Sequence, residues 1–156
     1  MKYIRNTTDF YIEENTVISL GKFDGIHRGH ELLLEHLTAK KEEGLAGVIF
    51  TFDIPPRKNV EKIEAKVLTT NEEKMHIFEQ LGVDYLVECP FTKEIMCMEA
   101  EDFIEKIVNQ LHVKCFVVGE DAHFGHNRRG DYKMLQEYAK EYGYEVIVVK
   151  KMQEDE

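Results

Sequence analysis

Apolar residues recur along this chain with two spacings, one typical of strands and the other of helices. Five short segments rich in β-branched and apolar residues predict buried strands: Thr16–Leu20, Ala46–Phe52, Asp84–Cys89, Val113–Val118 and Glu145–Val149. Four segments between them repeat apolar residues at helical spacing and predict helices: Gly29 to about Glu43, Asn71–Leu81, Glu99–His112 and Asp131–Tyr142. Gly44, Gly82 and Gly143 each follow a predicted helix, where glycine commonly ends it.

The regular alternation of strands and helices predicts an α/β fold. We expect a doubly wound parallel sheet of about five strands, with helices on both faces. Ligands of such sheets bind at the carboxyl ends of the strands, near the point where the strand order reverses. Residues 53–67 show no clear periodicity and predict a loop. With 156 residues and no internal repeat, we expect residues 1–156 to form a single domain.

A glycine-rich segment follows the first predicted strand and opens the first predicted helix: Ser19-Leu-Gly-Lys-Phe-Asp-Gly-Ile-His-Arg-Gly-His30. Its glycines allow a tight turn and the close approach of a ligand to the main chain. The N-terminus of the helix offers unpaired N–H groups and the positive end of the helix dipole, which favour an anion. His27 and His30 lie three positions apart and can both point toward that anion. This first motif therefore predicts a nucleotide phosphate site.

A second segment of glycines and charged residues follows the fourth predicted strand: Val117-Val-Gly-Glu-Asp-Ala-His-Phe-Gly-His-Asn-Arg-Arg-Gly-Asp131. The first motif resembles the signature of the HxGH nucleotidyltransferase superfamily. Its Phe-Asp-Gly resembles the adenylyltransferase module of bacterial bifunctional riboflavin kinase/FAD synthetases. The second motif is similar to that family's second signature, roughly V-V-G-x-D/N-x-x-F-G-x-x-R-x-G-D. Two long motifs in the right order make the resemblance specific, and it implies a Rossmann-like nucleotidyltransferase fold of the HUP type.

The resemblance implies transfer of AMP from ATP to FMN, which gives FAD and pyrophosphate in the presence of Mg²⁺. His27 and His30 are then the catalytic residues, which bind phosphates and stabilise the charge that develops on the leaving pyrophosphate. The ATP-binding residues that the resemblance implies are Gly21, Phe23, Asp24, Gly25, Gly29, Gly119 and Asp121. The residues expected to bind the flavin or its phosphate are Asp53, His123, Phe124, Gly125 and Arg128.

Several of these residues also have an ordinary structural interpretation. Asp24 could cap the first helix, and Asp53 could be a turn residue. Phe124 could belong to the core, because an aromatic residue beside a buried strand is often packed there. Arg128 could tie its loop down instead of pairing with a phosphate, and Asp131 could cap the following helix.

The chain departs from the family pattern in three places. Residues 51–57 resemble the family's T-F-x-P-H-P segment, but Ile54 and Pro55 stand where Pro-His is usual. Ala122 and His123 replace the common Phe-Arg or Phe-Thr. The sequence also ends before the family's I-S-S-x-x-I-R segment and its riboflavin kinase domain, so we expect no kinase activity. These departures leave the identity of the acceptor and the rate of turnover open.

The net charge of −10 opposes binding to nucleic acid or to an anionic membrane. Four of the seven histidines nevertheless lie in the two motifs, as a small polyanion such as ATP would require. The sequence has no apolar run of roughly 20 residues and no signal peptide, which predicts a cytoplasmic protein. Three cysteines without paired spacing predict free thiols. The sequence does not indicate the oligomeric state.

Three alternatives remain at this point. Another HxGH transferase, such as a cytidylyltransferase or pantetheine-phosphate adenylyltransferase, would share the first motif but not the second. A nucleotide- or flavin-binding module with little or no turnover would keep both motifs. Zinc could be bound by four histidines, namely His27, His30, His123 and His126, but the glycines would then be unexplained.

Overall fold

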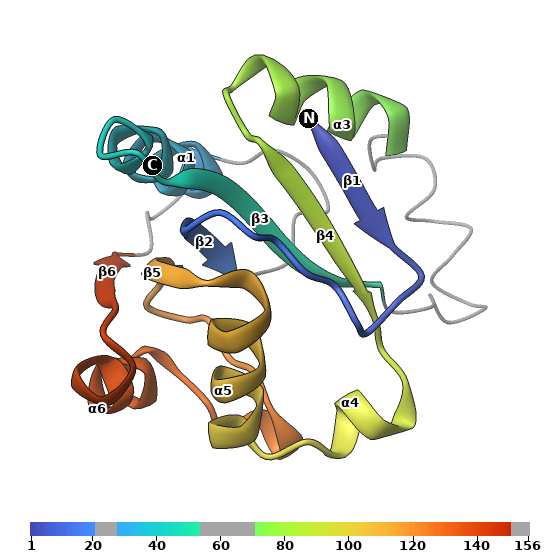
Figure 1. The fold of residues 1–156 in the computed structure, drawn as a ribbon, viewed down its shortest axis with the longest axis vertical. Coiled ribbons are helices and arrows are strands. Elements are labelled where there is room, and N and C mark those ends of the chain that lie inside the picture. The colour runs from blue at the N-terminus through green and yellow to red at the C-terminus, as the bar shows by residue number, and fades with distance from the viewer. Residues whose placement is uncertain (21–27, 54–70, 151–156) are drawn as a thin grey trace.

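The computed structural model describes residues 1–20, 28–53 and 71–150 of the chain (Figure 1). The strands are β1 (Lys2–Arg5), β2 (Thr16–Leu20), β3 (Ala46–Asp53), β4 (Tyr85–Pro90), β5 (Val113–Gly119) and β6 (Glu145–Val149). The described α-helices are α1 (Arg28–Lys41), α3 (Asn71–Gln80), α4 (Lys93–Cys97), α5 (Ala100–Leu111) and α6 (Tyr132–Tyr142). A short 3₁₀ helix, η1 (His126–Arg128), lies between β5 and α6.

The strands form one parallel sheet in the order β1-β4-β3-β2-β5-β6. From β2 the chain moves outward through β3 to β4 on one side, and later through β5 to β6 on the other side. The strand order therefore reverses between β2 and β5, which pair directly. This is the topological switch point, where open α/β sheets bind their ligands.

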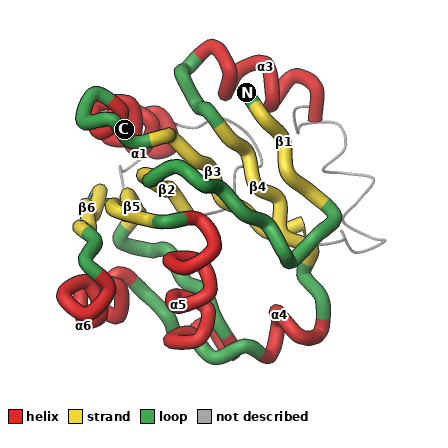
Figure 2. The backbone as a smooth tube through the Cα atoms, viewed as in Figure 1, coloured by secondary structure: helices red, strands yellow, loops and turns green. Residues whose placement is uncertain are grey.

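Helices cover both faces of the sheet, as predicted (Figure 2). On one face, Leu37 of α1 and Phe78 of α3 are fully buried in a cluster with alternate residues of the central strands. On the other face, Phe103 and Ile107 of α5 and Leu135 of α6 pack against the residues that point the opposite way. The two buried clusters hold the central strands in place, so the carboxyl ends of β2 and β5 have a rigid base.

The sheet has one strand more than the five predicted. β1 was missed because it is a four-residue edge strand that pairs only with β4 and in which no residue is fully buried. α4 was also missed, because Ile95 is its one buried residue and leaves no helical pattern to recognise. The Thr92 hydroxyl caps α4 by accepting a hydrogen bond from the Ile95 N–H at 3.2 Å.

The other element boundaries agree with the prediction to within about two residues, which is the usual uncertainty of helix and strand ends. Gly143 ends α6 with a φ of 73°, and its N–H donates to the Ala139 carbonyl oxygen. Beyond Asp53, the loop predicted for residues 53–67 lies outside the described residues. No helix in the described part of the chain is long and apolar enough to cross a membrane.

Candidate active site

The two motifs begin at the same edge of the sheet, on neighbouring strands. β2 and β5 run parallel, with Ser19 beside Val117 in register. β2 ends at Leu20 and β5 ends at Gly119. The prediction that both motifs follow the carboxyl ends of strands near a switch point is therefore confirmed, although the motifs lie far apart in the sequence.

The first motif is described only at its helical end. Five of its predicted site residues lie outside the described residues: Gly21, Phe23, Asp24, Gly25 and His27. Gly29 and His30 belong to the first turn of α1, which begins at Arg28. α1 connects two parallel neighbours, β2 and β3, so it must run back from the carboxyl edge of the sheet to the amino edge. The N-terminus of α1 therefore lies at the edge where the second motif begins.

Gly119 and Asp121 lie together in the turn after β5. A Cβ atom on Gly119 would lie 3.0 Å from Oδ1 of Asp121, so glycine leaves the room that this carboxylate occupies. The N–H of Ala122 donates to the Gly119 carbonyl oxygen at 3.1 Å and closes the turn. Two of the predicted ATP-binding residues thus form one compact turn at the switch point.

Residues 120–130, which we call the second-motif loop, close on themselves through Phe124 and Gly130. The backbones of these two residues exchange hydrogen bonds of 3.1 and 2.8 Å. The Phe124 ring lies over Gly130, where any side chain would collide with it. Phe124 is buried and packs against Phe103 of α5, with 5.6 Å between the ring centroids. Its burial supports the packing interpretation, and a contact with the flavin stays a prediction.

Gly125 seats the second-motif loop on the start of α5. Its φ is 81°, and a Cβ atom there would lie 2.7 Å from Cα of Ala100. The N–H of His126 also donates to the Met98 carbonyl oxygen at 2.9 Å. Glycine is required here both by the left-handed backbone and by the close approach of the neighbouring chain. Sequence reasoning missed this seat, for which the motif glycine was the available signal.

The loop buries its apolar residues and presents its polar ones. The exposed polar side chains between β5 and α6 belong to Glu120, Asp121, His123, Asn127, Arg128 and Arg129. His123 and Arg128, both predicted to bind the flavin or its phosphate, are therefore accessible to a ligand. Asp131 ends the segment as the N-cap of α6, where its Oδ1 accepts a hydrogen bond from the Met134 N–H at 3.1 Å. The capping interpretation of Asp131 is confirmed.

Asp53 is the last residue of β3 and lies in register with Pro90 of β4. Its backbone is thus at the same edge as both motifs, one strand away from β2. Within the described residues, no group of three or more His, Cys, Asp or Glu side chains could hold a metal ion. The zinc alternative therefore has no support in this part of the chain.

The three cysteines are free, as predicted. Cys89 and Cys115 are buried in the sheet, and burial raises the pKa of each thiol from 9.0 to about 11. Both thiols are therefore protonated at neutral pH and are not nucleophiles.

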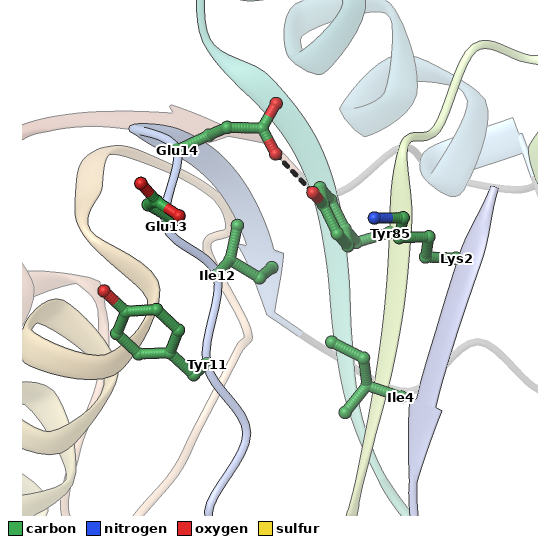
Figure 3. A pocket seen from close by; sticks show the side chains of 7 residues that line it. All are labelled: Lys2, Ile4, Tyr11, Ile12, Glu13, Glu14 and Tyr85. Atoms are coloured by element: carbon green, nitrogen blue, oxygen red, sulfur yellow. Dashed lines mark hydrogen bonds between the residues drawn. The ribbon is translucent and has the colours of Figure 1, made fainter.

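A hollow of about 680 Å³ lies elsewhere, against β1, β4 and the segment before β2 (Figure 3). It reaches Lys2 and Tyr85, the first residues of β1 and β4, so it opens at the amino edge of the sheet. The Tyr85 hydroxyl donates a hydrogen bond to Glu14, which raises the pKa of Tyr85 to about 12. Glu13 and Glu14 line this hollow and would repel a polyphosphate, so it is not the predicted site.

Residues 10–156 match the family model described as FAD synthetase. The bifunctional riboflavin kinase/FMN adenylyltransferase of Escherichia coli (strain K12) is 34% identical over 138 residues, which are 86% of this chain and 44% of that protein. The protein of the same name from Buchnera aphidicola subsp. Acyrthosiphon pisum is 32% identical over 154 residues, covering 96% of this chain and 49% of that protein. The chain thus spans about half the length of these curated relatives.

Two solved structures support the fold. A protein described as a macrolide-efflux protein from Streptococcus pneumoniae superposes with a TM-score of 0.79 and 24% identity, over 98% of this chain and 50% of the other. Pantoate-beta-alanine ligase (pantothenate synthetase) from Thermus thermophilus superposes with a TM-score of 0.54 and 14% identity, over 99% of this chain and 63% of the other. The family model covers nearly the whole sequence, and both family motifs begin at the switch point of the sheet. The chain therefore belongs to the FAD synthetase family.

Proposed function

We propose that this chain transfers AMP from ATP to FMN and releases FAD and pyrophosphate. The observation that carries the proposal is the origin of both family motifs on the paired strands β2 and β5, at the switch point. The curated relatives that this chain matches are named for FMN adenylyltransferase activity, among others. The second motif separates this proposal from other HxGH transferases.

In the proposed reaction, a phosphate oxygen of FMN attacks the α-phosphorus of ATP. A new phosphorus–oxygen bond forms, the bond from the α-phosphorus to the bridging oxygen breaks, and pyrophosphate leaves with the electron pair. The FMN phosphate is mostly dianionic at neutral pH, because its second pKa is about 6, so the attack needs no strong general base. The protein must therefore hold the two phosphates in line and neutralise the developing charge.

The N-terminus of α1 is the main source of that neutralisation on the β2 side. Its unpaired N–H groups and the positive end of the helix dipole favour an anion at the carboxyl edge of the sheet. We assign His27 and His30 to the phosphates and to the charge that develops on the leaving pyrophosphate. The glycines at positions 21, 25 and 29 would let the nucleotide approach the backbone.

The second-motif loop supplies the other side of the proposed site. Gly119 and Asp121 form the turn nearest to β2, and a carboxylate there suits a hydroxyl or N–H group of the nucleotide better than a phosphate. His123 and Arg128 are exposed and suit the phosphate of FMN. Asp53, at the end of β3, is the remaining candidate on the flavin side.

Mg²⁺ would enter with ATP. This ion usually keeps several waters and binds through substrate phosphates and one or two carboxylates, so it needs no preformed cluster of three ligands. Asp121 is an exposed carboxylate that fits such a contact. Bound Mg²⁺ would neutralise part of the triphosphate charge. We place the reaction in the cytoplasm, where free cysteines such as these persist.

The test is to incubate the chain with FMN, ATP and Mg²⁺ and to look for FAD by chromatography. A variant carrying both His27→Ala and His30→Ala is the control. FAD formed by the parent alone supports the proposal. Binding of ATP or FMN without formation of FAD would instead support a binding module without turnover, and failure to bind either ligand would contradict the site itself.

A further inference from the structure

Glu99, which lies outside both motifs, contacts the second-motif loop through its side chain. It occupies the N-cap position of α5, where a side chain usually accepts a hydrogen bond from the helix's own N–H groups. Glu99 makes no such capping bond. Its carboxylate instead lies 3.7 Å from Nδ1 of His126 and 4.0 Å from Nη1 of Arg129.

The neighbours of Glu99 contact the same loop through their backbones. The Met98 carbonyl oxygen accepts a hydrogen bond from the His126 N–H, and Ala100 packs directly against Gly125. Three consecutive residues before and at the start of α5 therefore hold the loop by a hydrogen bond, by ion pairs and by close packing. The loop is docked at this point and does not hang free from β5.

The two residues between the Glu99 contacts have an unfavourable backbone conformation. Asn127 has a φ of 58° and Arg128 a φ of 55°, both in the left-handed region. Asparagine tolerates this region, but arginine rarely adopts it, because its Cβ atom crowds the following carbonyl oxygen. Such a conformation persists only where the surroundings enforce it, and it is commonly found at functional sites. Glu99 contacts His126 and Arg129, which flank the strained pair on both sides.

We propose that Glu99 is a positioning residue, which holds the left-handed turn that presents Arg128 to the FMN phosphate. Arg128 would touch the substrate, and Glu99 would act only through His126 and Arg129. The consequence for catalysis rests on the proposed adenylyl transfer to FMN. The effect on the conformation of the loop does not.

The first test needs no substrate. It compares Glu99→Gln with Glu101→Gln, which removes the same charge from the first turn of the same helix. Hydrogen–deuterium exchange is followed in peptides that cover residues 125–130, where the N–H groups of Arg128, Arg129 and Gly130 donate within the loop. Because the ion pairs are exposed, we expect exchange to be about 2- to 5-fold faster in Glu99→Gln and unchanged in Glu101→Gln. Equal exchange in the two variants would overturn the proposal.

The second test separates positioning from general stability. We expect Glu99→Gln to raise KM for FMN about 2- to 5-fold, with kcat and the thermal midpoint unchanged and Glu101→Gln like the parent. In a chain that already carries His126→Gln and Arg129→Gln, Glu99→Gln should have no further effect. A rise in KM of the same size in that background would contradict the proposed route. If no variant forms FAD, the proposed function fails, while the exchange experiment still decides the role of Glu99.

Discussion

Ser19 and Val117 lie side by side on neighbouring parallel strands, each close to the carboxyl end of its strand. The first motif continues from Ser19 toward α1, and the second begins at Val117 and continues into the loop that covers the start of α5. A single pairing of two central strands thus brings together segments that are distant in the sequence. The proposed chemistry depends on that pairing, because the N-terminus of α1 and the Gly119–Asp121 turn must serve the same ligand.

His30 lies in the first turn of α1, where a side chain can reach an anion at the helix N-terminus. We expect His30→Ala to lower kcat about 10²- to 10³-fold, the usual effect of removing one group that stabilises developing charge. His36→Ala is the matched control, since His36 is exposed farther along the same helix. Steady-state formation of FAD measures both. Equal activity of the two variants would remove His30 from the catalytic residues.

Gly125 has to satisfy both a left-handed backbone and the close contact with Ala100. We expect Gly125→Ala to lower the free energy of unfolding by about 2–4 kcal/mol, because the strain of the backbone and the overpacking add together. Gly143→Ala is the control, since Gly143 has a φ of 73° but no heavy atom within 4 Å of an added Cβ atom. Strain alone should cost about 1–2 kcal/mol there. Denaturant unfolding of both variants measures the difference, and equal losses would show that the seat on Ala100 contributes nothing.

Phe124 packs against Phe103 and over Gly130, so its main contribution should be to stability. We expect Phe124→Ala to lower the free energy of unfolding by about 3–5 kcal/mol. Because Phe103 and Phe124 contact each other, the variant that lacks both rings should lose less than the sum of the single losses. If Phe124→Ala instead left stability unchanged and raised only KM for FMN, the ring would have to contact the flavin.

The cysteines should differ sharply in reactivity. Cys97 is exposed, whereas Cys89 and Cys115 are buried and their pKa values are raised to about 11. Native protein treated with iodoacetamide at pH 8 should therefore take up one label per chain, on Cys97, as read by peptide mass spectrometry. Between pH 9 and 11 the unfolded state binds fewer protons at the two buried thiols than the folded state, so the stability that they contribute should fall as the pH rises through this window. Rapid labelling of Cys89 or Cys115 in folded protein at pH 8 would contradict the described core.

The central strands could be predicted closely because burial leaves an unmistakable pattern. All five residues of β2 are buried, and the predicted and observed bounds coincide. β1 carries no such pattern, since it is an edge strand paired on one side only. The order of the strands could not be read from periodicity, because the pairing of β2 with β5 depends on contacts between distant segments.

The candidate site shows the same division. Gly119, Asp121 and Arg128 were found from the motif, because the family pattern marks them directly. The two roles considered for Phe124 are distinguished by a contact with Phe103 that no local pattern reveals. Glu99 and Ala100 escaped notice altogether, since neither belongs to a motif and their importance arises only when the loop folds back onto α5.

The fate of isotopic label from ATP tests the central claim most directly. The chain is incubated with FMN and Mg²⁺ and with ATP labelled at either the α- or the γ-phosphorus. The proposed attack of FMN on the α-phosphorus predicts that the α label appears in FAD and that the γ label appears in pyrophosphate, with no label left on the protein. Absence of the α label from FAD, or label bound covalently to the protein, would contradict direct transfer of AMP to FMN.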